Sequence, residues 1–133
     1  MNGNELLVLA QEAMMKAYAP YSGVFVGAAL LTAGGKVYTG CNVENASYSP
    51  TNCAERTAFF KAVSEGERAF TAIAIVGGKG GKIRDFFPPC GVCRQVMLEF
   101  CKEDFKIFLT DGKEVRELSL RELTPCGFTP DKL

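Results

Sequence analysis

The chain has 133 residues, with fifteen basic residues, fifteen acidic residues and no histidine. This length predicts one domain spanning residues 1–133, and the balanced charge disfavours a polyanion such as nucleic acid as a partner. Without histidine, a Ser-His-Asp triad, a Cys-His pair and a histidine metal site are excluded, so proton transfer must use Glu, Asp, Lys, Tyr or Cys. We expect no signal peptide, because no basic segment precedes an apolar run, and no membrane span, because no run of about 18 apolar residues occurs.

The first part of the chain predicts a helix followed by a β-hairpin. Asn4 is a candidate helix cap, and apolar residues then recur at helical spacing until the segment 20–23, which is expected to end the helix. Residues 24–31 and 36–43 are typical of strands, and the glycines between them at 33–36 predict a tight turn.

The rest of the chain alternates helices and strands. After a loop at 44–51, a helix is expected over residues 52–65, where Gly66 ends it. The apolar run 72–76 predicts a strand covered on both faces, and 77–89 predicts a long loop. The remaining predicted elements are a helix beginning near Cys90, a strand at 105–110 and a short helix at 118–123. This order favours an α/β domain with a mixed sheet between helices.

Three of the six cysteines predict a zinc site. Cysteines without a signal peptide indicate a reducing compartment, so we expect a cytoplasmic protein in which clustered cysteines bind metal rather than form disulfides. Cys90 and Cys93 are three residues apart at one helix start, and Cys53 lies at another. Helix starts stabilise thiolates, and three thiolates suit a zinc ion that keeps its fourth position for water. The sequence therefore predicts one Zn²⁺ per chain.

Two residues next to Cys53 are candidates for roles around this metal. Glu55 could take a proton from a zinc-bound water and deliver it to a ring nitrogen and then to a leaving amine. A zinc ion with three thiolates carries a net negative formal charge. We therefore hypothesise that Arg56 donates a hydrogen bond to a ligand sulfur, with Arg94 as another positive group near the site.

Each of these patterns has an alternative interpretation. Asn52 and Glu55 are spaced as a capping box, in which Glu55 would only stabilise its own helix. Cys90 and Cys93 alone could form a redox pair.

The other three cysteines leave a further alternative. Cys41 or Cys101 could supply a fourth ligand and close a purely structural zinc site in a binding module. Otherwise Cys41, Cys101 and Cys126 are expected to be packing residues. The glycine-rich segment 77–82 fails the spacing of a phosphate-binding P-loop and predicts a surface loop.

Four segments, 20–30, 40–48, 52–56 and 89–95, together resemble the small homotetrameric cytidine deaminases of the zinc-dependent deaminase superfamily. The resemblance covers nearly the whole chain and implies a three-layer α/β/α sandwich around a mixed, mainly five-stranded sheet. It implies hydrolytic deamination of cytidine and 2′-deoxycytidine to uridine and 2′-deoxyuridine, with release of ammonia, in pyrimidine salvage. In that chemistry a zinc-bound hydroxide attacks C4 of cytosine while the residue matching Glu55 moves protons.

The resemblance also implies the substrate contacts. Asn42 and Glu44 match residues that hold the sugar 3′-hydroxyl, and a carboxylate there would not accept a phosphate, so a nucleoside is the implied substrate. Further substrate positions are Asn45 and Ala46 in the same segment, Tyr48 at a subunit contact beside the sugar, Ala54 with its backbone near the base, and Phe128 stacking on the base from a neighbouring subunit. Phe128 could instead only hold down the C-terminal tail.

Val24 departs from the family pattern, which usually has phenylalanine there against the base. Phe25 follows it, but adjacent strand residues point to opposite faces, so we expect a looser base pocket. Two other activities use the same chemistry. One is deamination of a related aminopyrimidine such as a nucleoside antibiotic, which Asn42 and Glu44 argue against. The other is nucleic-acid editing, which the balanced charge and the lack of a basic arm argue against.

Overall fold

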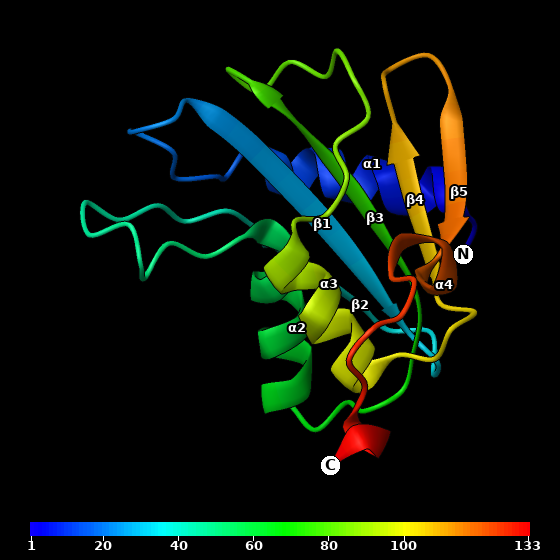
Figure 1. Ribbon diagram of the computed structural model, residues 1–133. Coiled ribbons are helices and arrows are strands. Elements are labelled where there is room, and N and C mark those ends of the chain that lie inside the picture. Colours follow the sequence, from blue (N-terminus) through cyan, green and yellow to red (C-terminus); the bar gives the residue numbers. More distant parts are fainter.

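A five-stranded mixed sheet forms the centre of the protein (Figure 1), and the computed structural model describes all residues 1–133. The strands are β1 (Val24–Thr32), β2 (Val37–Cys41), β3 (Phe70–Lys79), β4 (Lys106–Thr110) and β5 (Val115–Ser119). Their order across the sheet is β2-β1-β3-β4-β5, and only the β3–β4 pair is parallel. This arrangement confirms the predicted mixed sheet.

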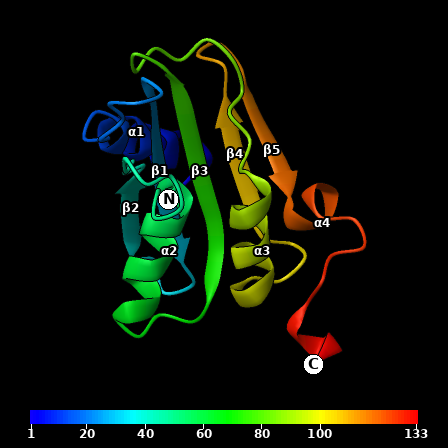
Figure 2. The same ribbon diagram turned by 60° about the vertical axis from the view of Figure 1, so that its left-hand side comes forward.

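Helices cover both faces of the sheet (Figure 2), which gives the predicted three layers. Helix α1 (Gly3–Met14) packs on one face, and helices α2 (Ala54–Ser64) and α3 (Gly91–Phe100) pack on the other. A short helix α4 (Leu120–Leu123) follows β5, and a 3₁₀ turn (Pro130–Lys132) lies near the C-terminus. None of the helices has both the length and the apolar character of a membrane span.

The strand directions bring the starts of α2 and α3 to the same end of the sheet. Strands β2 and β3 both run antiparallel to β1, so their C-terminal ends both lie beside the N-terminal end of β1. Helix α2 follows β2, and α3 is the crossover between the parallel strands β3 and β4. Both helices therefore begin at this end of the sheet and run back along it, which places the residues of their first turns together.

The first helix begins and ends earlier than predicted. Its cap is Asn2 rather than Asn4, because the Asn2 side chain accepts a hydrogen bond from the Glu5 N–H (2.9 Å). The helix ends at Met14, well before the segment 20–23. The Tyr18 N–H donates to the Asn42 carbonyl (3.0 Å), and the Tyr18 carbonyl accepts from the Glu44 N–H (2.9 Å). These long-range bonds draw the chain into an extended path.

Strand β5 and the end of β3 were also missed. Strand β5 (Val115–Ser119) lies at the sheet edge with mostly exposed side chains, so it lacks the apolar alternation that predicts a strand. The helix expected at 118–123 begins only at Leu120, where Ser119 and Glu122 form a capping box. Residues 77–79, predicted as loop, continue β3 and pair with β1.

Candidate active site

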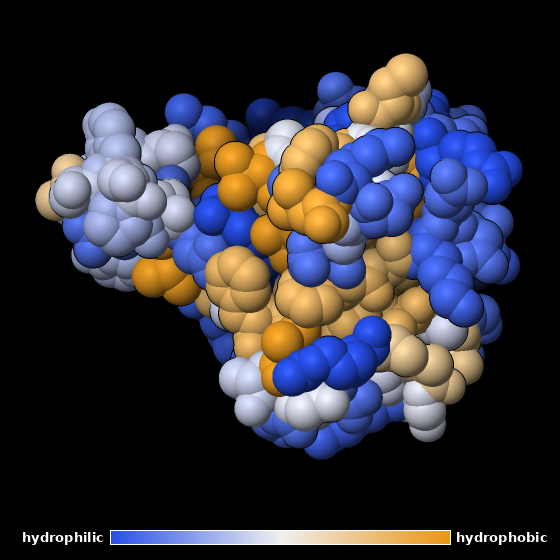
Figure 3. Space-filling view, turned by 60° about the horizontal axis from the view of Figure 1, so that its bottom comes forward, coloured by the Kyte–Doolittle hydropathy of each residue, from blue (hydrophilic) through white to orange (hydrophobic).

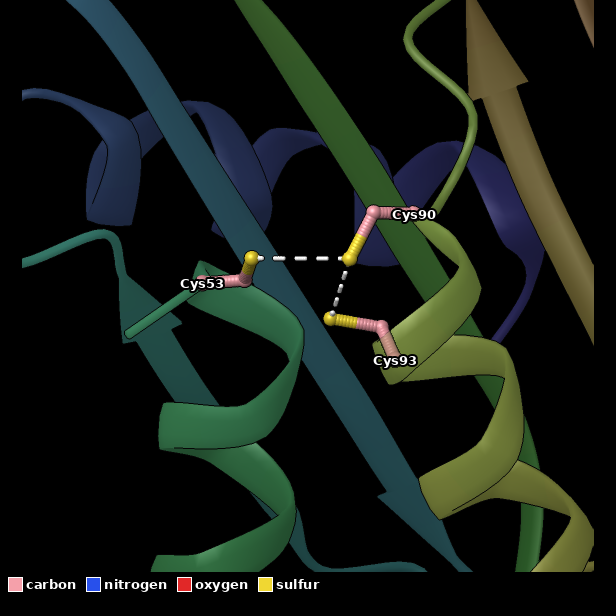
Figure 4. A group of neighbouring side chains, drawn as sticks. All are labelled: Cys53, Cys90 and Cys93. Atoms are coloured by element: carbon pink, nitrogen blue, oxygen red, sulfur yellow. Dashed lines mark hydrogen bonds between the residues drawn. The ribbon is translucent and has the colours of Figure 1, made fainter. Parts of the chain in front are cut away.

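Three cysteine sulfurs meet where α2 and α3 begin (Figure 4). Cys53 and Cys90 are the N-cap residues of these helices, and Cys93 lies in the first turn of α3. The Sγ atoms of Cys53 and Cys90 are 3.7 Å apart and those of Cys90 and Cys93 are 3.5 Å apart. Neither N-cap thiol makes a capping hydrogen bond with its own helix, and the sulfurs of Cys53 and Cys93 both lie next to that of Cys90.

These spacings fit a tetrahedral metal. At a Zn–S distance of about 2.3 Å, two sulfurs of a tetrahedral site lie about 3.8 Å apart. The Sγ atoms of Cys53, Cys90 and Cys93 all lie within 4.8 Å of one another, and no fourth cysteine or carboxylate belongs to the group. These three donors could hold a zinc ion and leave one position for water, whereas a closed structural site needs a fourth protein ligand.

Arg56 lies against the cluster. Its Nη2 atom donates a hydrogen bond to Cys53 Sγ at 3.2 Å, which is the contact hypothesised from the sequence. Hydrogen bonding to the Cys93 thiol and to the Arg56 guanidinium lowers the pKa of Cys53 to about 5. The thiolate form of Cys53 is thus favoured near neutral pH, whereas the same hydrogen bond and burial raise the pKa of Cys93.

Glu55 is buried in the first turn of α2, with only 3% of its surface exposed. The capping box that its position suggested does not form, because Cys53 is the N-cap residue and the Asn52 side chain donates instead to the Thr57 hydroxyl. Burial raises the pKa of Glu55 to about 7. A carboxyl group that titrates near neutral pH beside the cysteine cluster is suited to carrying a proton in either direction.

Asn42 and Glu44 follow β2, and Asn42 is fixed by the start of β1 whereas Glu44 is fixed by the segment before it. Asn42 is buried, and its side chain accepts from the Val26 N–H and donates to the Val24 carbonyl, both at 2.8 Å. Glu44 accepts from the N–H groups of Tyr21 (2.9 Å) and Ser22 (3.1 Å), and its other oxygen accepts from the Ser22 hydroxyl. The Ser22 hydroxyl and N–H hold the pKa of Glu44 below its usual range, so it remains a carboxylate.

A pocket of about 300 Å³ opens beside Glu44, where the 44–51 loop meets the segment before β1. Its lining residues are Tyr21, Ser22, Glu44, Asn45, Tyr48 and Thr51. Tyr48 is 77% exposed, and its ring meets that of Tyr21 edge to face with centroids 6.4 Å apart. Ala46 is exposed in the same loop, which projects from the body of the protein (Figure 1).

The other predicted base-pocket residues divide between the site and a distant surface. Ala54 is fully buried beside Cys53. Val24 packs on the sheet face of α2 and α3, whereas Phe25 packs on the α1 face, so Phe25 does not take its place. Phe128 is 58% exposed, and its segment runs along the side of α3 away from α2 (Figure 2). Within one chain, the Phe128 backbone is held against α3 by the Gln95 side chain, which donates to its carbonyl at 2.8 Å.

The three remaining cysteines lie outside the cluster. Cys41 and Cys101 are half-buried, as packing residues can be. Cys126 is exposed, contrary to the packing prediction, and it has a positive φ of 56° in the segment after α4. A positive φ is uncommon for a residue other than glycine and is typical of turns.

The cysteine cluster with a buried glutamate is matched by a known family. A family model described as the cytidine and deoxycytidylate deaminase zinc-binding region matches residues 2–109. The chain belongs to this family. The match includes both cysteine segments, and it confirms the resemblance read from the motifs.

Individual relatives of the family cover the chain from end to end. Cytidine deaminases from Sporosarcina psychrophila and Halalkalibacterium halodurans are 46% and 47% identical over 134 residues, covering all of this chain and 96% and 98% of the relatives. The crystal structure of a cytidine deaminase from Burkholderia pseudomallei is 49% identical with a TM-score of 0.89, covering 96% of this chain and all of that one. A cytidine deaminase structure from Mycobacterium tuberculosis is 40% identical with a TM-score of 0.83, covering 96% and 98%.

Two contacts around the site were not foreseen from the sequence. Ser22 was noted only as part of a motif, yet its hydroxyl holds Glu44 and also accepts from the Val24 N–H (3.0 Å). Arg94 was a candidate positive group beside Cys93, but its guanidinium donates to the backbone carbonyls of Pro89 and Leu123. The Pro20–Tyr21–Ser22 motif was the available signal for the first contact, and no local signal existed for the second.

Proposed function

We propose that the protein hydrolyses the exocyclic amine of cytidine and 2′-deoxycytidine, forming uridine or 2′-deoxyuridine and ammonia in pyrimidine salvage. The observation that carries this proposal is the buried carboxyl of Glu55 in the same helical turn as Cys53, beside three converging thiols. Membership of the deaminase family and full-length relatives named cytidine deaminase support it.

Cys53, Cys90 and Cys93 would hold one Zn²⁺ per chain. When bound, zinc lowers the pKa of a coordinated water so that it can act as a nucleophile near neutral pH. Arg56, bonded to Cys53 Sγ, offsets part of the negative charge of three thiolates, which would otherwise oppose that ionisation. Glu55 would transfer one proton of the attacking water to N3 of the ring, where it stays in the product, and would then transfer the second proton, from the new hydroxyl at C4, to the amine, which leaves as ammonia.

The sugar would lie toward Asn42 and Glu44. The Glu44 carboxylate already accepts three hydrogen bonds from residues 21 and 22, which fix its position, and it can still accept from a sugar hydroxyl. Because it stays ionised, it repels a phosphate group. A nucleoside therefore suits this site better than a nucleotide. Asn45, Ala46 and Tyr48 would border the sugar, and Ala54 and Val24 would border the base.

A homotetramer would complete the base pocket. Apolar side chains gather over α2 and α3 on the face shown in Figure 3. Phe60 on α2 is 48% exposed and Val92 on α3 is 57% exposed, so this face has apolar surface for another subunit to cover. Phe128, which is largely exposed in the single chain, would then stack on the base bound by a neighbour.

Replacing Phe60 by aspartate should separate the subunits. Burying a carboxylate in an apolar interface is costly, so Phe60→Asp should sediment as a smaller species and lose most of its activity while it retains zinc. Val8→Asp is the matched control, since Val8 is 53% exposed on α1, on the opposite side of the sheet. It should change neither assembly nor activity. A monomer with full activity would refute the role of Phe128 and Tyr48 across subunits.

The activity itself is tested by metal content and ammonia release. We expect one zinc per chain and stoichiometric ammonia from cytidine and from 2′-deoxycytidine, with both activities lost on chelation and restored by zinc. Cytidine 5′-monophosphate and single-stranded DNA serve as controls and should release little ammonia. Zinc-loaded protein that leaves both nucleosides intact would overturn the proposal.

A further inference from the structure

Arg94 links the loop before Cys90 to the C-terminal part of the chain. Its Nε atom donates to the carbonyl of Pro89 at 2.8 Å, and its Nη1 atom donates to the carbonyl of Leu123 at 3.0 Å. Pro89 immediately precedes Cys90, and Leu123 is the last residue of α4. A single half-buried guanidinium thus joins two segments more than 30 residues apart in sequence.

The next residue along α3 holds the same C-terminal segment. Gln95 Nε2 donates to the carbonyl of Phe128 at 2.8 Å. The segment also packs closely on α3, since a Cβ added at Gly127 would lie 2.8 Å from a methyl group of Leu98. Residues 120–128, which comprise α4 and the segment after it, are therefore attached to the helix whose first turn carries Cys90 and Cys93.

Among the three clustered cysteines, Cys90 is the one whose position depends most on Arg94. Of the three clustered cysteines, Cys53 is half-buried, Cys93 is buried and Cys90 is exposed. An exposed thiol has few packing neighbours to hold it, so its position depends on the backbone on either side. Arg94 fixes the peptide on one side, and a planar guanidinium can hold two carbonyls in one fixed geometry, which a lysine ammonium cannot.

We propose that Arg94 is a positioning residue that couples the metal cluster to the C-terminal segment. By holding the Pro89 carbonyl against the end of α4, it keeps Cys90 in place, so retention of zinc depends on an ordered segment 120–128. The coupling is reciprocal, so zinc in turn orders that segment. This inference rests on the proposed function, because it takes the cysteine cluster as a zinc site.

The first test compares zinc release from Arg94→Lys and Arg68→Lys holoproteins to a chromogenic chelator. Arg68 is a matched control, because its Nη1 atom also binds two carbonyls, those of Val63 and Glu67, but beyond the far end of α2. We expect zinc release at least about 10-fold faster from Arg94→Lys, as for other residues that orient metal ligands, and no more than twofold faster from Arg68→Lys. Equal release rates from the two folded variants would overturn the proposal.

The second test needs no substitution, so it remains decisive if Arg94→Lys fails to fold. Hydrogen exchange is compared between wild-type protein with zinc and after chelation. Exchange in segment 120–128 should rise several-fold while exchange in α1 stays unchanged. Unchanged exchange in the segment, or an equal rise in α1, would refute local coupling.

The zinc site and the role of Arg94 would be refuted by different results. Wild-type protein that binds no zinc would refute the metal site and the proposed function with it. Wild-type protein that binds zinc and deaminates cytidine, with Arg94→Lys releasing zinc no faster than Arg68→Lys, would refute only the role of Arg94.

Discussion

Glu55→Gln should lose about 10⁴-fold in kcat, the upper end of what one proton-transferring side chain contributes. Glutamine has the size of glutamate but cannot accept a proton from water or deliver one to the amine. The surroundings of Glu55 leave no substitute, since the chain has no histidine and this carboxyl is buried in the first turn of α2. Initial rates of ammonia release on cytidine measure the loss.

The variant should retain zinc and fold normally, because Glu55 is not one of the three clustered metal donors. Its melting temperature should not fall, since an uncharged amide has no charge to desolvate at this buried position. Glu65→Gln, at the other end of α2 where the side chain is 51% exposed, is the control and should keep full activity. Substantial turnover by Glu55→Gln would remove Glu55 from the mechanism.

The sequence was most informative where chemistry constrains spacing. Two cysteines three residues apart at a helix start must lie on one side of that helix, so Cys90 and Cys93 could be paired without a structure. That Cys53 would join them followed from expecting a helix to begin there as well. The strand directions supply the physical reason, since both helices begin at the end of the sheet where β2 and β3 end.

The sequence was least informative where long-range hydrogen bonds decide the path of the chain. Tyr18 lies in a segment with helical apolar spacing, yet it pairs with the residues after β2. Strand β5 exists because β4 offers it hydrogen-bonding partners, although its own side chains are mostly exposed. Arg94 is adjacent to Cys93 in sequence, but a long side chain on a helix can extend away from its neighbour's, and here it binds two carbonyls.

Substituting two glycines that face opposite sides of the sheet should distinguish effects on the stability of the fold from effects on the geometry of the site. A Cβ added at Gly40 in β2 would lie 2.5 Å from the Ala54 carbonyl oxygen and 2.7 Å from the Ala58 nitrogen, both backbone atoms of α2. A Cβ added at Gly27 in β1 would meet the backbone of α1 instead, at Ala10 and Met14. Backbone atoms cannot rotate away, so each alanine would push its helix off the sheet.

Gly40→Ala should therefore displace the turn that carries Cys53 and Glu55. We expect a cost of about 3 kcal/mol in the free energy of unfolding, at the upper end for overpacking, together with weakened zinc binding and at least about a 100-fold loss in kcat/KM. Gly27→Ala should lose similar stability but keep its zinc affinity and most of its activity. Urea unfolding, zinc titration and cytidine kinetics on both variants measure the three effects.

If Gly27→Ala lost zinc as readily as Gly40→Ala, the geometry of the site would depend on the stability of the whole fold rather than on the packing of α2 against β2. If Gly40→Ala kept full activity, the first turn of α2 would not need its close approach to the sheet.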